Sequence, residues 1–405
     1  MIDVLVAGAG IGGLTAALSL HAAGIDVRVV DPVDELRPVG VGVDLLPYAV
    51  GELTQLGLGG GLAATAVAPE AAVHFDRHGE RVGGEPCGLA LGHAWPRYSL
   101  HRGALQLMLL DAVRDRLGDH AVRTGTAFVR LAEREGAGLR VILRDMERGR
   151  EYGVGVRALV GADGLHSAVR ATLHPGEGPP LWSGVRMWRG ITEWLPVLGG
   201  QTIAMAADDT AKFVVHPVSR WARERGRALL SWVAEVRFPP AHHQAVAGPA
   251  DWNRSGRLSD VLPHFAGWRM ADLDVPALIA GTRQILECPM VDRDPLARWG
   301  RGPVTLLGDA AHPMCPSYPV GSESGSQAVL DARALAQCLA YAGADRETGL
   351  RHYEDVRGEA ANAVVLAARS GPWALGRSLP RPSGRRGAPG SAERGLRPPM
   401  PDGRP

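Results

Sequence analysis

The sequence has few cysteines, no long hydrophobic run and almost no net charge. Its four cysteines are scattered among 405 residues without the spacing of metal ligands, so neither a zinc site nor a disulfide framework is expected. Reduced thiols of a cytoplasmic protein are the preferred interpretation. No apolar run reaches the length of about 18 residues that a transmembrane helix needs. The net charge of +1 gives no field that would attract nucleic acid or an anionic membrane.

The N-terminus also lacks the basic segment of a signal peptide, because it leads directly into a strand-like run. The first thirty residues then predict a strand, a helix and a second strand. An apolar run is followed by a segment rich in Ala and Leu, and then by another apolar run. These elements cover residues 4–7, 14–23 and 27–30. This is a βαβ unit.

A glycine loop joins the first strand to the helix and carries the pattern G-x-G-x-x-G. The first glycine allows a tight turn, the second lets the backbone approach a pyrophosphate, and the third lets helix and strand pack closely. The helix start offers N–H groups to phosphates, and an acid ending the second strand can accept from ribose hydroxyls. The predicted dinucleotide site comprises Gly8, Gly10, Ile11, Gly12, Gly13 and Asp31. This motif does not separate FAD from NAD, and the alternative is a glycine-rich turn of another α/β protein.

Two later segments share one pattern, in which an aspartate ends a buried strand beside a small residue. They are residues 158–164, with Asp163, and residues 304–313, with Asp309. Each aspartate can accept from a ribose or ribityl hydroxyl, and the alternative is that it caps the helix that follows. Both motifs, in this order after a βαβ opening, favour a flavin.

These motifs resemble those of the class A flavoprotein monooxygenases, the family built like p-hydroxybenzoate hydroxylase. The resemblance covers about residues 1–370. It implies a mixed α/β (α+β) fold in which a Rossmann-like FAD-binding domain carries an inserted β-sheet substrate domain. It also implies that the glycine motif binds the ADP part of FAD, that Asp163 contacts FAD and the reduced nicotinamide, and that Asp309 binds the ribityl chain. Arg102 looks like the flavin-contacting arginine of the family, and the alternative is a surface charge at a helix start.

The chain is expected to fall into four segments. Residues 1–180 form the first part of the FAD-binding domain and residues 181–290 a mostly β substrate domain. Residues 291–370 form the second part of the FAD-binding domain with C-terminal helices. Residues 371–405, rich in Pro, Gly and Arg, are expected to lack fixed structure. Helices are expected at 49–56, 105–117, 326–340 and 360–369, and strands at 213–216, 229–236 and 304–307.

The resemblance implies a reaction in which NAD(P)H reduces FAD and O2 then forms a C4a-hydroperoxide that hydroxylates an aromatic ring. Only one G-x-G-x-x-G is present, which fits a family that binds NAD(P)H without a second Rossmann domain. Residues 37–43, 187–190 and 289–296 are similar to the phenazine-modifying members. The predicted substrate is therefore a phenazine-like or other fused aromatic acid, hydroxylated with or without loss of its carboxylate. Alternatives are another flavoenzyme of this fold, such as a halogenase, an epoxidase or a reductase, and a flavin binder with impaired oxygenase activity.

Several residues are candidates for contact with this substrate. Glycines after the second strand would let the chain pass close to the isoalloxazine, unless they serve plain turns. Cations on the expected sheet would hold the carboxylate, unless they belong to the surface or the fold. Seven of the ten tryptophans fall between 182 and 268, where they line an aromatic pocket or fill a core. The candidates are Gly40, Gly42, Arg186, Trp188, Arg189 and His216. No metal and no side-chain nucleophile is expected, and the choice of NADH or NADPH and the oligomeric state stay open.

The loop after Asp309 departs from the family. Residues 315–317 look inserted before a Tyr-Pro-x-Gly segment, whose Pro319 and Gly321 are expected near the flavin. Glu323 opens a stretch that replaces an Asn-Gly-Ala-like sequence of relatives. Its charge would oppose the negative charge of reduced flavin, so the hypothesis is slower flavin reduction or a lower potential. A redox titration that gives an ordinary class A potential would remove this hypothesis.

Overall fold

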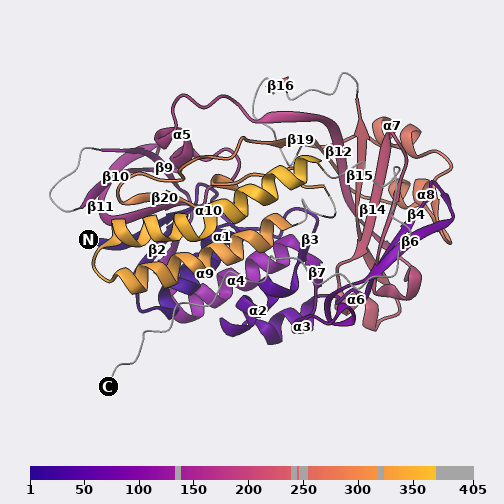
Figure 1. Cartoon of the computed structure of the whole chain (residues 1–405), viewed down its shortest axis with the longest axis horizontal. Helices are drawn as coiled ribbons and strands as arrows, with labels where there is room; N and C mark the ends of the chain where they lie inside the picture. The colour runs from indigo at the N-terminus through magenta and orange to yellow at the C-terminus, as the bar shows by residue number, and fades with distance from the viewer. Residues whose placement is uncertain (133–137, 239–243, 246–253, 318, 320–322, 371–405) are drawn as a thin grey trace, which may run out of the picture.

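The computed structural model describes residues 1–132, 138–238, 244–245, 254–317, 319 and 323–370. The predicted tail at 371–405 and Gly321 lie outside these residues. Two sheets organise the described chain, one at each end of the molecule (Figure 1). None of the described helices is long and apolar enough to cross a membrane.

The first sheet carries the predicted nucleotide-binding motifs. Its seven strands have the order β8-β2-β1-β11-β10-β9, with β20 beside β11. Strands β8, β2, β1, β11 and β20 run parallel, so their carboxyl ends meet at one edge. The strands are β1 (Ile2–Ala7), β2 (Val27–Val30), β8 (Val122–Arg123), β9 (Thr126–Leu131), β10 (Leu139–Asp145), β11 (Arg150–Gly161) and β20 (Val304–Leu306). The predicted strands at 4–7, 27–30 and 304–307 are confirmed.

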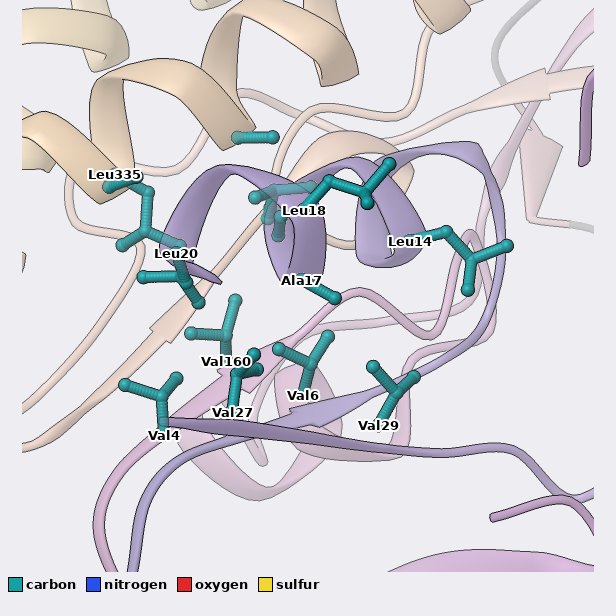
Figure 2. Packing of buried hydrophobic residues seen from close by; sticks show 14 of the residues in the cluster. Val4, Val6, Leu14, Ala17, Leu18, Leu20, Val27, Val29, Val160 and Leu335 are labelled. Carbon is teal, nitrogen blue, oxygen red and sulfur yellow. The ribbon is translucent and has the colours of Figure 1, made fainter. Parts of the chain in front are cut away.

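Helices cover this sheet. Apolar side chains of α1, among them Leu14, Leu18 and Leu20, lie over the valines of β1, β2 and β11 (Figure 2). Small residues keep α1 close to α9, which packs against α10 along its length (Figure 1). The helices of this region are α1 (Ile11–Ala22), α2 (Pro47–Gln55), α3 (Gly59–Thr65), α4 (Arg102–Leu117), α5 (Ala168–Leu173), α9 (Ser324–Ala342) and α10 (Arg346–Ser370). The four predicted helices are confirmed, and α10 begins 14 residues before the predicted start at 360.

The second sheet has eight strands in the order β16-β12-β15-β14-β13-β4-β6, with β19 beside β12. They are β4 (Ala71–Phe75), β6 (Arg81–Pro86), β12 (Leu181–Trp194), β13 (Thr202–Ala207), β14 (Ala211–Pro217), β15 (Ala228–Arg237), β16 (Gln244–Ala245) and β19 (Ile285–Asp292). Strands β4 and β6 come from within the first predicted segment, so this sheet is larger than the residues 181–290 expected to build it. The division of the chain into domains at 180 and 290 stays a prediction.

Smaller elements surround the second sheet. Helices α7 and α8 cover one of its faces, together with a short sheet of β5, β17 and β18 (Figure 1). Strands β3 and β7 form a two-stranded sheet near the other face. These elements are β3 (Gly42–Leu45), β5 (His78–Gly79), β7 (Tyr98–His101), α6 (Arg220–Glu224), α7 (Leu258–Val261), β17 (Arg269–Met270), β18 (Leu273–Asp274) and α8 (Val275–Ala280).

The two faces of the second sheet have different surroundings. We call outer the face beneath α7 and α8, where Trp188, Phe213 and Trp232 are buried in one apolar cluster. We call inner the opposite face, where Met187 packs against Cys315 from the loop that precedes α9. Side chains alternate along a strand, so residues of β12 with odd numbers from 185 to 191 lie on the inner face and even ones on the outer face.

This alternation places two of the predicted substrate contacts on the face opposite Arg189. Trp188 is completely buried in the outer cluster, so it fills a core. Arg186 also points outward, where its guanidinium lies 3.6 Å from Glu287 and over the ring of Phe238. Neither side chain can line the same surface as Arg189, because adjacent residues of a strand point to opposite faces. Of the tryptophans expected in this region, Trp252 lies outside the described residues.

Candidate functional site

The glycine loop has the close contacts that only glycine tolerates. Gly8 has a φ of +110°, and a Cβ there would lie 2.3 Å from the carbonyl oxygen of Ala162. A Cβ on Gly13 would lie 1.9 Å from the Gly8 oxygen. A Cβ on Gly10, in contrast, would meet no atom within 4 Å. The loop is therefore tight where it packs on the protein and open at the one glycine over which a pyrophosphate is expected to pass.

Helix α1 begins at this open position. Gly10 is its N-cap residue and provides no side-chain hydrogen bond to the first turn. The N–H groups of that turn are thus available to an anion, with the positive end of the helix dipole behind them. Gly12 faces away from this opening, since a Cβ on it would lie 2.6 Å from Leu307. Its role is close packing of the helix, and Ile11 is similarly buried.

Asp31 follows β2 beside the glycine loop. One of its carboxylate oxygens accepts from the Ala9 N–H at 2.7 Å, and the other accepts from the Val33 N–H at 3.1 Å. Each oxygen retains a second lone pair for a ribose hydroxyl. Gln106 of α4 donates to the Ala9 carbonyl at 2.8 Å and so holds the loop from its other side. Sequence reasoning missed Gln106, which has no motif around it.

Asp163 caps the helix that follows it. Its carboxylate accepts from the Ser167 hydroxyl at 2.5 Å and from the N–H groups of Ala168 and Val169 at 2.8 and 3.2 Å. Burial raises the pKa of this carboxyl, and the hydrogen bond from Ser167 opposes the shift. These contacts support the capping alternative, while contact with FAD or nicotinamide stays a prediction.

Asp309 lies exposed just after β20, at the same sheet edge as Asp31 and Gly8. The Ser324 hydroxyl, at the start of α9, donates to its carboxylate at 2.5 Å. An exposed carboxylate at the end of a buried strand remains accessible to a ribityl hydroxyl. Ser324, which belongs to the stretch expected to differ from relatives, therefore turns toward this acid.

Arg170 links the second motif to the third. This buried guanidinium donates to the carbonyl oxygens of Ala310 and Ala311 at 3.0 and 2.8 Å and pairs with Glu177 at 2.5 Å. Carbonyls in the turn after β20 are thus fixed by the helix after β11. The sequence shows Arg170 only as a charge early in a helix, and nothing in its spacing reveals these partners.

Two predicted cations approach each other near Asp309. Arg102 begins α4, and its side chain lies alongside Gly40, where a Cβ would be 3.7 Å from the Arg102 Cδ. Desolvation lowers the pKa of Arg102, the charge of Asp309 opposes this shift, and the positive charge of Arg189 adds to it. Arg189 reaches this place from the inner face of β12. Two guanidinium groups close enough for their charges to interact favour an anionic ligand nearby.

Gly42 and His216 meet where β3 packs on the second sheet. The Gly42 N–H donates to the Ser231 hydroxyl at 3.0 Å, and a Cβ on Gly42 would lie 2.8 Å from the His216 ring. Asp44 lies 3.4 Å from Nδ1 of His216. Gly42 thus permits close packing, and His216 already faces a carboxylate. Their predicted contacts with flavin and substrate stay predictions.

The buried acid Asp44 joins β3 to its neighbours. It accepts from Arg97 at 2.8 Å and also from the Ser99 hydroxyl. Burial alone would raise the pKa of Asp44, but the positive charges of Arg97 and His216 outweigh it and lower the pKa. This cluster fixes β3 and β7, from which the chain enters α4 at Arg102.

The loop between Asp309 and α9 is described in part. Pro319 lies at the surface in a turn, and Gly321 is outside the described residues. Glu323 accepts from the Tyr48 hydroxyl at 3.2 Å and from Gln327 at 3.3 Å. Burial raises the pKa of Glu323, and the hydrogen bonds from Gln327 and Tyr48 oppose this shift. Its effect on the flavin potential stays a hypothesis.

The assembled site fits a flavin dinucleotide. Three features share one edge of the parallel sheet. They are the open Gly10 at the start of α1, Asp31 beside it at the end of β2, and the exposed Asp309 at the end of β20, three strands from β2. No group of three or more potential metal ligands occurs within the described ranges. The arrangement therefore suits a long diphosphate-containing cofactor whose far end reaches the inner face of the second sheet.

Comparisons with known proteins agree with this geometry. The profile of the FAD binding domain family matches residues 1–246 and 277–368. Phenazine 1,6-dicarboxylic acid hydroxylase PhzS of Lysobacter antibioticus is 47% identical over 370 residues, which cover 91% of this chain and 89% of that protein. Aurachin C monooxygenase/isomerase of Stigmatella aurantiaca is 33% identical, with coverage of 90% and 87%. HpxO of Klebsiella pneumoniae, solved with FAD and uric acid, aligns with a TM-score of 0.75 at 27% identity, with coverage of 91% and 87%.

Proposed function

The chain belongs to the FAD binding domain family and is an FAD-dependent aromatic monooxygenase with the p-hydroxybenzoate hydroxylase-like fold, and we propose that its substrate is a phenazine-like acid. One observation carries the substrate class: the 47% identity to a phenazine dicarboxylic acid hydroxylase extends over 91% of the chain. The carboxylate of such an acid also matches the positive charge of Arg189, which lies near the flavin-binding candidate Arg102.

Bound FAD supplies the redox chemistry and the activation of oxygen, and the protein supplies binding and orientation. The first turn of α1, open at Gly10, binds the diphosphate. Asp31 accepts from the ribose of the adenosine and Asp309 from the ribityl chain. Arg102 holds the flavin end of the cofactor, as the family resemblance implies.

The substrate acid lies against the inner face of the second sheet. Arg189 lies on that face, where its charge acts on Arg102, and binds the carboxylate in a charge-assisted and directional contact. The apolar residues around it, among them Met187 and Val233, keep water from the reacting ring. A fixed carboxylate places one ring edge toward the cofactor, which is how orientation contributes to the rate.

NAD(P)H and O2 are the co-substrates in this proposal. The single G-x-G-x-x-G supports transient binding of NAD(P)H without a Rossmann domain of its own. A cytoplasmic location is proposed with them, because the four cysteines, all within the described residues, form no disulfide.

The decisive experiment is turnover by the purified protein. Oxidised flavin absorbance should be present, and oxidation of NADH or NADPH should accelerate when phenazine-1-carboxylate or phenazine-1,6-dicarboxylate is added. Mass spectrometry should find a product with one added oxygen, or with a hydroxyl in place of a carboxylate. Stimulation by unrelated monocyclic acids alone would contradict the phenazine class. Oxidation that yields only H2O2 would favour the alternative of an impaired oxygenase.

A further inference from the structure

A buried ion pair crosses the inner face of the second sheet. Lys212 of β14 and Glu235 of β15 occupy directly paired positions, and Nζ lies 3.0 Å from Oε2. Their side chains are 0% and 1% exposed. The hydroxyl of Ser317 lies against both groups: it donates to Oε2 at 2.8 Å and accepts from Nζ. Ser317 is itself buried and ends the segment 315–317 that looks inserted relative to the family.

Stability does not account for this pair. Removing two charges from water costs several kcal/mol for each ion, and apolar residues of similar volume are often at least as stable. The neighbours on this face, Val214 and Val233, are apolar and buried or half-buried, so an apolar pair would pack there. The pair fixes the position and orientation of the Ser317 hydroxyl, because an ammonium donor and a carboxylate acceptor both bond to it.

Residues 315–317 pack against the inner face. Cys315 packs with Met187 of β12 and Cys288 of β19, while Ser317 reaches β14 and β15. Residues 315–317 therefore cross the row of side chains formed by Cys288, Met187, Glu235 and Lys212. The thiol of Cys315 also lies 3.4 Å from Asp292.

The next row along the same face contains Arg189, between Leu286 of β19 and Val233 of β15. Arg189 is two residues beyond Met187 on β12, and rows on one face of a sheet are separated by about 7 Å. The segment 315–317 thus ends beside the surface on which the proposed acid lies. A ring system extending from Arg189 in that direction meets this segment first.

We propose that Lys212 and Glu235 are positioning residues that hold Ser317, and with it segment 315–317, as the end wall of the acid-binding surface around Arg189. This inference rests on the proposed function. The wall limits how far a ring system extends from the carboxylate. Lys212, Glu235 and Ser317, which we call the triad, therefore set the preference among aromatic acids of different length. It does not take part in flavin reduction or oxygen transfer.

The test compares three variants on the holoenzyme. Ser317→Ala removes the hydroxyl and keeps the ion pair, whereas Ser317→Thr keeps a hydroxyl. The double variant Lys212→Met/Glu235→Leu removes both charges at similar volume. Thr282→Val is the matched control, because the Thr282 hydroxyl bonds Trp232 and Thr192 at the outer face. Dissociation constants for benzoate, 1-naphthoate and phenazine-1-carboxylate are measured from the flavin absorbance change, beside FAD affinity and thermal unfolding.

If segment 315–317 forms the end wall, the variants should change the preference among acids of different length and should not lose affinity for all of them. Ser317→Ala and the double variant should change the ratio of affinities for one-ring and three-ring acids by roughly fivefold, as loss of one buried hydrogen bond allows. Ser317→Thr should retain the wild-type ratio, and FAD affinity should stay within twofold in every variant. The control should unfold at lower temperature with an unchanged ratio.

Two failures are distinguishable. If wild-type protein binds the acids and Ser317→Ala, folded and loaded with FAD, keeps the same ratio within twofold, the wall is refuted while the proposed function stands. If the wild type binds none of the acids, the proposed function fails and the wall fails with it. Should the double variant not fold, the affinity ratios of Ser317→Ala and Ser317→Thr are sufficient to support or refute the wall.

Discussion

The two faces of the eight-stranded sheet are built by the same strands, yet one is an apolar core and the other carries charged residues. The outer face carries Trp188 and Trp232, both completely buried in an apolar cluster. The inner face carries Arg189 together with the buried pair of Lys212 and Glu235. Neighbours in sequence thus belong to separate environments, because side chains alternate between faces. We propose that the outer face serves mainly stability and the inner face recognition of the substrate, and each prediction below tests this division.

The largest effect is expected at the outer face. Trp188→Ala should lower the free energy of unfolding by roughly 3–5 kcal/mol, since it removes a large buried side chain and leaves a cavity. Trp188→Phe should cost less, because the indole N–H has no hydrogen-bond partner among the described residues. Urea unfolding measures both changes. If the folded fraction of Trp188→Ala also lost its affinity for aromatic acids, the separation of faces would be wrong.

The next effect belongs to the inner face. Arg189→Met should weaken binding of the aromatic acid by roughly 1.5–3 kcal/mol, or about 10- to 150-fold, because a charged hydrogen bond to the carboxylate is lost. Arg189→Lys should fall between, since it keeps the charge without the planar fork. Titration of flavin absorbance gives the dissociation constants. Unfolding should change little, and equal affinity in Arg189→Met would remove the arginine from the proposed site.

A smaller effect concerns the acid that fixes β3 against the inner face. The pKa of Asp44 is lowered in the fold, so its charged form stabilises the protein above the ordinary carboxyl value near 3.9, and this contribution is lost as the pH falls below it. Asp44→Asn should therefore be less stable at neutral pH by roughly 2 kcal/mol and show a shallower decline in acid. Thermal unfolding from pH 7 to pH 3 measures this.

Other acids also contribute to the loss of stability at low pH. Their contribution cancels when the profile of the wild type is compared with that of Asp44→Asn. Burial opposes ionisation of Asp331, but the charges of His312 and Arg357 lower its pKa to about 2. Its contribution is common to wild type and Asp44→Asn, so the difference between their pH profiles isolates Asp44. Parallel profiles would show that the charge of Asp44 does not stabilise the fold.

The smallest effect is expected for Arg186. Its guanidinium is half exposed on the outer face and pairs with Glu287 at 3.6 Å, so Arg186→Met should change stability by less than about 1 kcal/mol. Acid affinity should stay at the wild-type value. A substantial loss of affinity would return Arg186 to the candidates for the carboxylate and overturn its assignment to the outer face.

The comparison also explains what sequence reasoning found and missed. The glycine loop and the aspartates after β2 and β20 are local patterns, in which spacing fixes which strand end each residue occupies. Their meeting at one edge follows from parallel strands. Contacts such as Arg170 with the Ala310 carbonyl, or Gln106 with that of Ala9, join residues 140 and 97 positions apart, and no local pattern encodes them.

The predicted substrate contacts are divided between the two faces of the sheet for a related reason. Trp188 and Arg189 were both singled out from one short stretch, yet a strand permits only one of them to face the cofactor. The strand period was readable, but which face is inner depends on what packs against the sheet. Strands β4 and β6 joined that sheet without any signal in their own residues.

By itself the sequence determined the nucleotide-binding opening, the order of the strand-end acids and the resemblance to one flavoenzyme family, because each depends on residues close together in the chain. Only the tertiary structure decided which face of the second sheet meets the cofactor region, and that segment 315–317 lies buried against Lys212 and Glu235. Those features arise from packing between distant segments, where the free energy depends on which surfaces meet and not on local sequence.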